Sequence, residues 1–154
     1  MTDLSDCYCP SYFPARPDWC GSRVSKRTLS TVPAFAQDVQ LISPVDAHEK
    51  RRSGEVKLVD VRERFEWEEG GVAEGADLIA MRDPQIAAKF DALTGGDKNA
   101  PVALICRTGV RSGIVAQALA RAGYTNVYSV NGGMIGSSTG PGWKRTGLPV
   151  EAVE

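Results

Sequence analysis

The chain has 154 residues, a length that suits one domain with a proper hydrophobic core. Its formal net charge is −1 and 24% of its residues are charged, so the composition indicates neither nucleic-acid binding nor attachment to a charged membrane surface. No apolar run approaches the roughly 18 residues that a membrane-spanning helix needs. We therefore expect a globular domain that does not span a membrane.

The first 36 residues differ from the rest of the chain in composition and in hydrophobic periodicity. They contain Cys7, Cys9 and Cys20 but little periodicity. This cysteine spacing lacks a fourth ligand and matches no common zinc site, and a disulfide among the three would leave one thiol over. We expect residues 1–36 to be a poorly ordered or targeting-like segment, and residues 37–154 to form a single domain.

A possible cleavage site lies at the end of that segment. Ala34-Phe35-Ala36 has the small-residue form of a signal-peptidase site, with Lys26-Arg27 upstream. The apolar stretch between them is too short and too polar for a normal signal peptide. The sequence thus leaves two compartments open, the cytoplasm and, after export, the periplasm.

The ordered domain is expected to begin with a strand and a capped helix. The strand is Val39–Ile42, and Ser43 then caps a helix that has Pro44 at its first position and runs to about Arg52. His48, the single histidine, falls on this helix. We expect it on the surface, because nothing near it in sequence pairs with it.

The rest of the domain alternates strand and helix patterns. The expected elements are a strand at 56–61, a helical turn from 65, a strand at 77–80, a helix at 84–93, a strand at 101–105, a helix ending near 123 and a strand at 126–130. This order predicts an α/β fold, with an open, mostly parallel, twisted sheet of about five strands and helices on both faces. Such sheets bind ligands at the carboxyl ends of their strands.

The segment from Cys106 to Ser112 joins the strand at 101–105 to the following helix. A cysteine there lies over the helix N-terminus, where unpaired N–H groups and the helix dipole favour an anion. Arg107 and Arg111 add positive charge, and Gly109 lets the backbone N–H groups curl toward one centre. A thiol so placed is expected to ionise more readily than a free one, and the thiolate is the nucleophile. The alternative is a buried structural cysteine, but two nearby arginines are poor core material.

The sequence Cys-Arg-Thr-Gly-Val-Arg-Ser after a Val/Ile-rich strand resembles the active-site loop of the rhodaneses, which are thiosulfate and persulfide sulfurtransferases. The resemblance covers about residues 38–150 of the chain. Asp60 and Arg62 match the Asp-Val-Arg that ends a central strand near this loop in the family. We expect them to form an ion pair that fixes the wall of the pocket.

The chain departs from the family pattern at two places. Gly71 stands where the family motif Gly-His-Ile-Pro-Gly-Ala has its histidine. Trp143 follows Gly133 by ten residues, whereas family members often have a tryptophan only a few residues on. We therefore expect a flexible insertion of about six residues within Met134–Gly142, beside the active site.

The resemblance implies sulfur transfer through a persulfide on Cys106, from a small anionic donor such as thiosulfate to a thiophilic small-molecule or protein acceptor. No metal or organic cofactor is implied. The implied anion-binding loop consists of Arg107, Thr108, Gly109, Val110, Arg111 and Ser112. Its N–H groups would stabilise the anion in each state, and Thr108 would donate its hydroxyl to the outer sulfur. Arg107 and Arg111 would orient a small dianion. Ser112 would cap the helix.

Two other classes of function remain open. A phosphatase or arsenate reductase also binds a tetrahedral oxyanion in a cysteine–arginine loop, but it spaces the pair as Cys-x5-Arg. Cys106 and Arg111 are spaced as Cys-x4-Arg, and this shorter loop suits a sulfur atom more than a phosphoryl group. A non-catalytic module that carries sulfur or binds a partner protein is also compatible with the fold.

Overall fold

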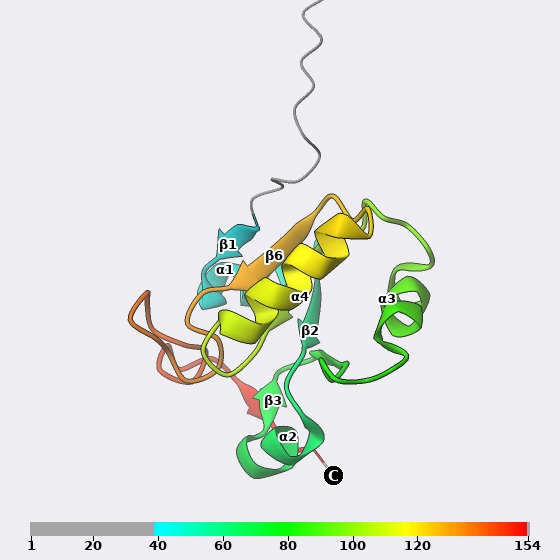
Figure 1. The fold of residues 1–154 in the computed structure, drawn as a ribbon. Helices are drawn as coiled ribbons and strands as arrows, with labels where there is room; N and C mark the ends of the chain where they lie inside the picture. The colour runs from blue at the N-terminus through cyan, green and yellow to red at the C-terminus, as the bar shows by residue number, and fades with distance from the viewer. Residues whose placement is uncertain (1–38, 154) are drawn as a thin grey trace, which may run out of the picture. The chain divides into compact units, whose positions relative to one another are not determined.

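A computed structural model describes residues 39–153 of the chain (Figure 1). The predictions for residues 1–36, including those for Cys7, Cys9, Cys20 and Ala34-Phe35-Ala36, lie outside the described residues. In chain order the elements are β1 (Gln40–Ile42), α1 (Pro44–Ser53), β2 (Lys57–Asp60), α2 (Arg64–Gly70), β3 (Val72–Ala73), β4 (Asp77–Leu78), α3 (Ile86–Thr94), β5 (Val102–Ile105), α4 (Val110–Arg121), β6 (Val127–Val130) and β7 (Val150–Glu151). Within residues 39–153, no helix combines the length and the apolar character needed to cross a membrane.

The main sheet has five strands in the order β1-β6-β5-β2-β4, and every neighbouring pair is parallel. β5 is the central strand, where Ala103 lies beside Leu58 of β2 and Tyr128 of β6. The predicted α/β class with a parallel sheet is confirmed. A second, antiparallel sheet of β3 and β7 was not predicted, because strands of two residues carry too little periodicity to detect.

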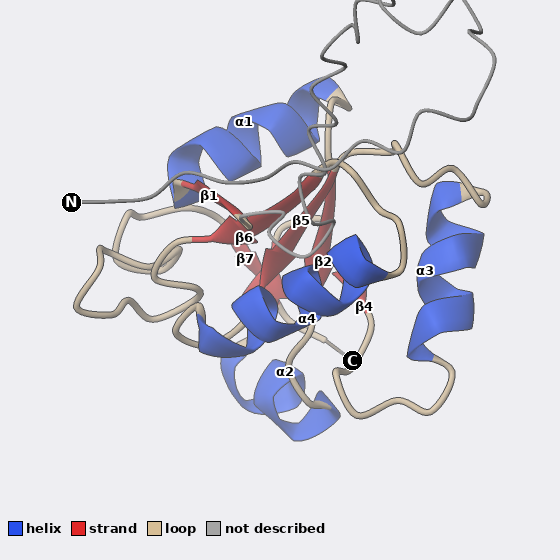
Figure 2. Ribbon diagram, turned by 45° about the horizontal axis from the view of Figure 1, so that its top comes forward, coloured by secondary structure: helices blue, strands red, loops and turns tan. Residues whose placement is uncertain are grey.

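Helices cover both faces of the main sheet, as predicted (Figure 2). On one face, α3 and α4 enclose a hydrophobic cluster that contains Phe90 and Leu104. On the other face, α1 contributes Ala47 to a second cluster that contains Ile105. Successive residues of β5 alternate between the two faces, and Cys106 continues the row that faces α4.

Helix α1 begins and ends close to the predicted residues. The hydroxyl of Ser43 accepts the N–H of Asp46 at 3.1 Å, and Pro44 occupies the first helical position. Gly54, with φ 79°, ends the helix in the left-handed conformation that glycine adopts at little cost. The capping residues alone therefore located this helix.

The prediction that His48 lies on the surface is wrong. Its side chain is 12% exposed, and its ring meets the Trp143 indole edge-on with the centroids 5.4 Å apart. Its Nδ1 lies 4.0 Å from a carboxylate oxygen of Glu74. His48 is covered because α1 packs against the segment that carries Trp143, a contact between distant parts of the chain that helix periodicity does not reveal.

Trp143 itself is fully buried, and the expected insertion precedes it. This segment, residues 134–142, forms a loop next to the end of β6. The hydroxyl of Thr139 donates to the side-chain oxygen of Asn131 at 2.6 Å, and the Asn131 amide donates to the Thr139 carbonyl at 3.1 Å. The insertion is thus tied to the main sheet, and its flexibility stays a prediction.

Candidate active site

The segment 106–112 lies at the carboxyl end of the central strand, where the fold places a ligand site. Helix α4 starts at Val110, and Gly109 before it has φ 101°. That backbone conformation is one that side chains rarely adopt, so the glycine permits the abrupt turn from β5 into α4. The turn brings the N-terminus of α4 directly over Cys106.

The Cys106 side chain is enclosed by this turn. Cys106 is only 1% exposed, and its Sγ accepts the N–H of Gly109 at 3.1 Å. Ser112 Oγ lies 3.5 Å from the same sulfur. The first N–H groups of α4 have no carbonyl partner within the helix, so they add donors and partial positive charge at this end. The arrangement offers several hydrogen-bond donors to an anion at the position of the sulfur.

The prediction that Ser112 caps the helix is wrong. Gly109 holds the capping position, and Ser112 lies within the first turn of α4. The Ser112 hydroxyl donates back to the Gly109 carbonyl at 3.0 Å and lies 2.8 Å from the hydroxyl of Ser129 on β6. The helix begins earlier than the capping preference of serine suggests, because Gly109 supplies the left-handed turn.

Backbone N–H groups of the segment after β6 form hydrogen bonds to the turn between β5 and α4, residues 106–109, which we call the Cys106 turn. The N–H of Met134 donates to the Cys106 carbonyl at 2.8 Å, and the N–H of Ile135 donates to the Arg107 carbonyl at 3.0 Å. Gly133 makes this approach possible, because a Cβ at that position would lie 2.4 Å from the Cys106 carbonyl oxygen. The shape of the turn therefore depends on a glycine in a separate segment.

Arg111 reaches from α4 to α2 and binds Glu66. Its two terminal nitrogens donate to the two carboxylate oxygens at 2.6 and 2.7 Å. The hydrogen bonds from Arg111, with help from the backbone N–H of Glu63, lower the pKa of Glu66 to about 2 against the opposing effect of burial. The hydrogen bonds to Glu66 in turn raise the pKa of Arg111. Arg111 is thus held beside the turn, and the negative charge of Glu66 offsets part of its positive charge.

Asp60 and Arg62 form the predicted ion pair. Arg62 Nη2 lies 2.7 Å from Asp60 Oδ2, and their side chains are 5% and 0% exposed. The same nitrogen donates to the carbonyl of Gly71 at 2.6 Å, and Arg62 Nη1 donates to the carbonyl of Glu66 at 3.2 Å. The pair thereby fixes the end of β2 to helix α2, which carries the partner of Arg111.

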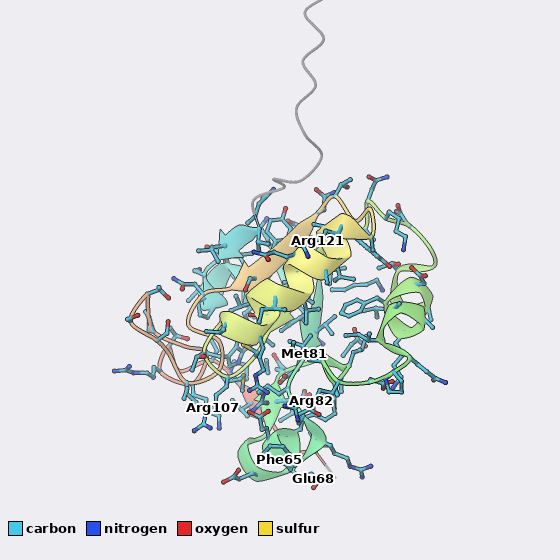
Figure 3. All side chains as sticks on the ribbon, viewed as in Figure 1. Phe65, Glu68, Met81, Arg82, Arg107 and Arg121 are labelled. Atoms are coloured by element: carbon cyan, nitrogen blue, oxygen red, sulfur yellow. The ribbon has the colours of Figure 1, made fainter. Side chains whose placement is uncertain are left out.

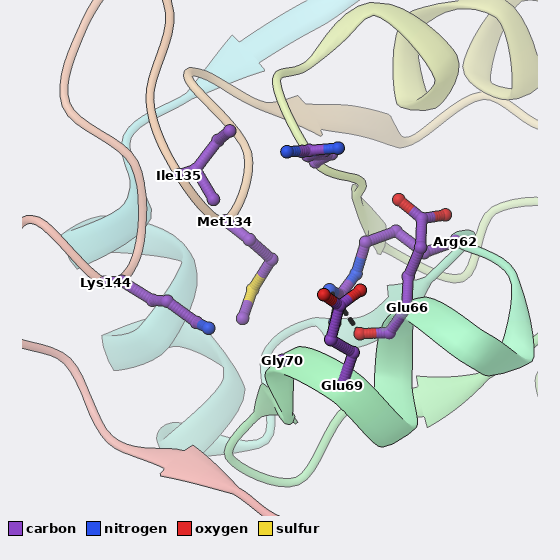
Figure 4. A pocket seen from close by; sticks show the side chains of 8 residues that line it. Arg62, Glu66, Glu69, Gly70, Met134, Ile135 and Lys144 are labelled. Carbon is purple, nitrogen blue, oxygen red and sulfur yellow. Dashed lines mark hydrogen bonds between the residues drawn. The ribbon is translucent and has the colours of Figure 1, made fainter.

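A pocket of about 300 Å³ opens beside the turn (Figure 4). Its lining residues are Arg62, Glu66, Glu69, Gly70, Arg107, Met134, Ile135 and Lys144. Arg62 and Glu66 are held in the ion pairs described above, whereas Arg107 and Lys144 have no ion-pair partner within residues 39–153. Arg107 is exposed at the same end of the domain as α2 (Figure 3). The pocket therefore presents the cations Arg107 and Lys144 together with one carboxylate, Glu69, that also has no ion-pair partner within these residues.

The remaining loop residues face a second pocket of about 260 Å³. Thr108, Gly109 and Val110 line it together with Ser129 and residues of the 134–142 loop. Val110 is 68% exposed. The loop thus lies between two pockets, with Arg107 on one side and Thr108 on the other.

Sequence reasoning missed three residues of this site, namely Glu66, Lys144 and Ser129. The Glu63-x-x-Glu66 spacing is that of a capping box, which the structure contains, but it signals a helix start and not an arginine partner. Ser129 was visible only as a polar residue in an otherwise apolar strand. In the part of the chain that the structure describes, no group of three or more His, Cys, Asp or Glu side chains is placed to hold a metal ion.

The Glu66–Arg111 pair predicts a pH-dependent stability. The folded-state pKa of Glu66 is about 2, below its ordinary value of 4.5, so the carboxylate stabilises the fold above pH 4.5 and loses this effect as the pH falls toward 2. Glu66→Gln should therefore lower the free energy of unfolding by about 2 kcal/mol near neutral pH, as expected for a charged hydrogen-bonded pair. The difference from wild type should shrink in acid. Urea unfolding at a series of pH values measures it.

Glu68→Gln is the matched control. Glu68 pairs with Arg64 at 2.8 Å, but the two side chains are 51% and 81% exposed. Its loss should cost less than about 0.5 kcal/mol at any pH. A Glu66→Gln effect that is equally large throughout the acid range would contradict the assignment.

The fold and the site together define a class of protein: an α/β domain with a cysteine at the junction of a central strand and the N-terminus of a helix. Residues 43–136 match the family model of the rhodanese-like domain. The chain therefore belongs to the rhodanese-like domain family.

Individual proteins and solved structures are similar to parts of this chain. The "Uncharacterized protein RC0915" of Rickettsia conorii is 31% identical over 98 residues, which cover 60% of this chain and 80% of the relative. The solution structure of the polysulfide-sulfur transferase homodimer from Wolinella succinogenes has a TM-score of 0.58 and 26% identity, and the match covers 79% of this chain and 83% of that one. A tRNA uridine(34) hydroxylase of Chlamydia pneumoniae is 31% identical over 113 residues, which cover 70% of this chain but only 35% of the hydroxylase.

Proposed function

We propose that this protein is a sulfurtransferase that carries a sulfane sulfur as a persulfide on Cys106. The observation that carries the proposal is the position of Cys106 Sγ, which accepts the Gly109 N–H at 3.1 Å at the start of α4. An outer sulfur bound to Sγ would extend toward the N–H groups of the same turn, which suit an anion. The similarity to the polysulfide-sulfur transferase of W. succinogenes supports this chemistry.

In the first half-reaction, the Cys106 thiolate attacks the outer sulfur of a donor such as thiosulfate. A new sulfur–sulfur bond forms on Cys106, the sulfur–sulfur bond of thiosulfate breaks, and its electron pair leaves with sulfite. The N–H groups from Arg107 to Arg111 stabilise the negative charge before and after the transfer. A thiolate nucleophile carries no proton, so this step needs no general base.

In the second half-reaction, an acceptor takes the outer sulfur. With cyanide, a carbon–sulfur bond forms, the persulfide bond breaks, and the products are thiocyanate and the Cys106 thiolate. The thiolate of a small molecule or of a partner protein would react in the same way and leave as a persulfide. Neither half-reaction calls for a metal or an organic cofactor.

The remaining residues have supporting roles in this proposal. Arg107 and Lys144 attract and orient the anionic donor in the pocket of about 300 Å³, a size at the lower end of the range for small-molecule sites. Thr108, which the sequence suggested as a hydroxyl donor to the outer sulfur, lines the second pocket, on the other side of the loop from this donor pocket. Arg111 adds positive charge, which the carboxylate of Glu66 offsets in part. The buried pair of Asp60 and Arg62 supports the pocket wall.

Intact-protein mass spectrometry tests the proposal directly. After exposure to thiosulfate, the protein should gain about 32 Da, the mass of one sulfur atom, and the gain should map to Cys106. Added cyanide should remove the gain and release an equal amount of thiocyanate.

The same samples separate the alternatives. A protein that gains no sulfur but hydrolyses an aryl phosphate would be a phosphatase, against the prediction from the Cys-x4-Arg spacing. A protein that gains sulfur but turns over only with a protein acceptor would be a sulfur carrier within a complex. A protein that does neither would refute the persulfide mechanism.

A further inference from the structure

We propose that Ser129 of β6 is a positioning residue that acts on Cys106 through the hydroxyl of Ser112. Ser129 is 1% exposed in a strand whose neighbouring Val127 and Val130 are buried in the core. Its hydroxyl lies 2.8 Å from that of Ser112, which is 3.5 Å from Cys106 Sγ. Three buried side chains thus form one hydrogen-bonded row, from the core of the sheet to the sulfur.

We assign a direction to this row from the hydrogens that its members can donate. The Ser112 oxygen carries one hydrogen, and the structure gives it three partners: the Gly109 carbonyl at 3.0 Å, the Ser129 hydroxyl and the Cys106 sulfur. The carbonyl is only an acceptor, so in the thiol state Ser112 donates to it. Ser129 and the Cys106 S–H then both donate to the Ser112 oxygen.

Ionisation of Cys106 changes this pattern at one bond. The S–H is gone, and the Ser112 hydrogen turns from the Gly109 carbonyl to the sulfur. The carbonyl is not left unpaired, because it also accepts the N–H of Gly113 at 3.2 Å. Ser129 donates to Ser112 in both states, so it holds the oxygen in place and polarises its hydroxyl toward the thiolate.

The charged groups around the turn are distinct from this row. They are Arg107 in the loop itself, Arg111 on α4 with Glu66 on α2, the Asp60–Arg62 pair at the end of β2, and Glu69 and Lys144 in the pocket beside the turn. The hydrogen bonds of Ser129 and Ser112 described above involve none of these residues. A change at Ser129 therefore tests the hydrogen-bonded row with those charges in place.

Alkylation of Cys106 by iodoacetamide is the experiment, because only the thiolate reacts. It is followed in the full chain on the tryptic peptide from Asn99 to Arg107, so that the other cysteines do not contribute. Ser129→Ala should slow alkylation about threefold near neutral pH, as expected when one polarising hydrogen bond is lost. Its rate should rejoin the wild-type rate in alkali, where the thiol is fully ionised. Ser129→Thr, which keeps the hydroxyl, should restore the neutral rate.

A double-mutant cycle shows whether Ser129 acts through Ser112. Ser112→Ala should slow neutral-pH alkylation more than Ser129→Ala does, because it removes the direct donor. The double variant should be alkylated at the same rate as Ser112→Ala, because without the Ser112 hydroxyl Ser129 has no group through which it can act on Cys106. The proposal would be overturned if the rate reductions of the two single variants multiplied in the double variant. It would also be overturned if Ser129→Ala were alkylated at the wild-type rate.

A purely structural role for Ser129 has a different signature. It would lower the unfolding temperature and change the alkylation rate by the same factor at all pH values, and that result would also overturn the proposal. Should Ser129→Ala fold poorly, Ser129→Cys, which is nearly isosteric and a weaker donor, gives the same comparison. Alkylation requires no sulfur donor, so its outcome is independent of the proposed sulfur transfer.

Discussion

Replacement of Cys106 by serine is expected to lower thiosulfate:cyanide sulfurtransferase activity by about 10⁴-fold or more, to the background of the assay. A serine hydroxyl stays protonated near neutral pH and forms no persulfide, so the first half-reaction stops. The fold should persist, because the oxygen is smaller than the sulfur and retains hydrogen bonding to the Gly109 N–H. Steady-state thiocyanate formation and thermal unfolding measure the two effects.

The other cysteines provide the matched control. A variant with serine at Cys7, Cys9 and Cys20 keeps Cys106 as its single thiol and should retain full activity. Activity in Cys106→Ser, or its loss in the triple variant, would show that the sulfur is carried elsewhere in the chain.

Gly133→Ala is expected to have the second largest effect, although Gly133 need not touch a substrate. Its φ is 57°, and an added Cβ would lie 2.4 Å from the Cys106 carbonyl oxygen and 2.7 Å from the Arg107 carbonyl carbon. Relief of this overlap must move the Cys106 turn by about an ångström, which can cost on the order of 10²-fold in kcat/KM. Backbone strain and overpacking together should also cost about 3 kcal/mol of stability.

Gly95→Ala separates the steric overlap from the backbone strain. Gly95 has φ 65°, close to that of Gly133, but a Cβ there would meet nothing within 4 Å. This variant should lose only about 1 kcal/mol of stability and no activity. Equal effects of the two substitutions on activity would mean that Gly133 does not set the position of the turn.

Much of the fold follows from local sequence pattern. The apolar strands predicted a parallel sheet, and the pair of Ser43 and Pro44 located the start of α1. Asp60 and Arg62 were expected to pair because they match the Asp-Val-Arg that ends a central strand in the rhodaneses, and the structure contains the pair. In each case the information lies within a few consecutive residues, and the physical rule acts at the same range.

The parts that the sequence did not reveal depend on contacts between distant segments. Arg111 was assigned to the substrate anion, but its guanidinium also has a carboxylate partner in Glu66, on a helix that precedes it by several elements. His48 is covered by Trp143, and Ser112 pairs with Ser129 instead of capping its helix. Such pairings are set by how the elements pack, which no local pattern encodes. The chemical roles of the loop residues stay predictions until the variants are assayed.

The two ends of the loop at residues 134–142 lie in close backbone contact with each other. The N–H of Trp143 donates to the Gly133 carbonyl at 2.8 Å, and a Cβ on Gly142 would lie 2.2 Å from the Gly136 nitrogen. The two ends of the loop are therefore pinned together below its tip. Doubling the length of a loop with fixed ends costs only about 0.6 kcal/mol. Residues 137–141 are thus a place where insertions can accumulate and be selected while the Cys106 turn keeps its geometry.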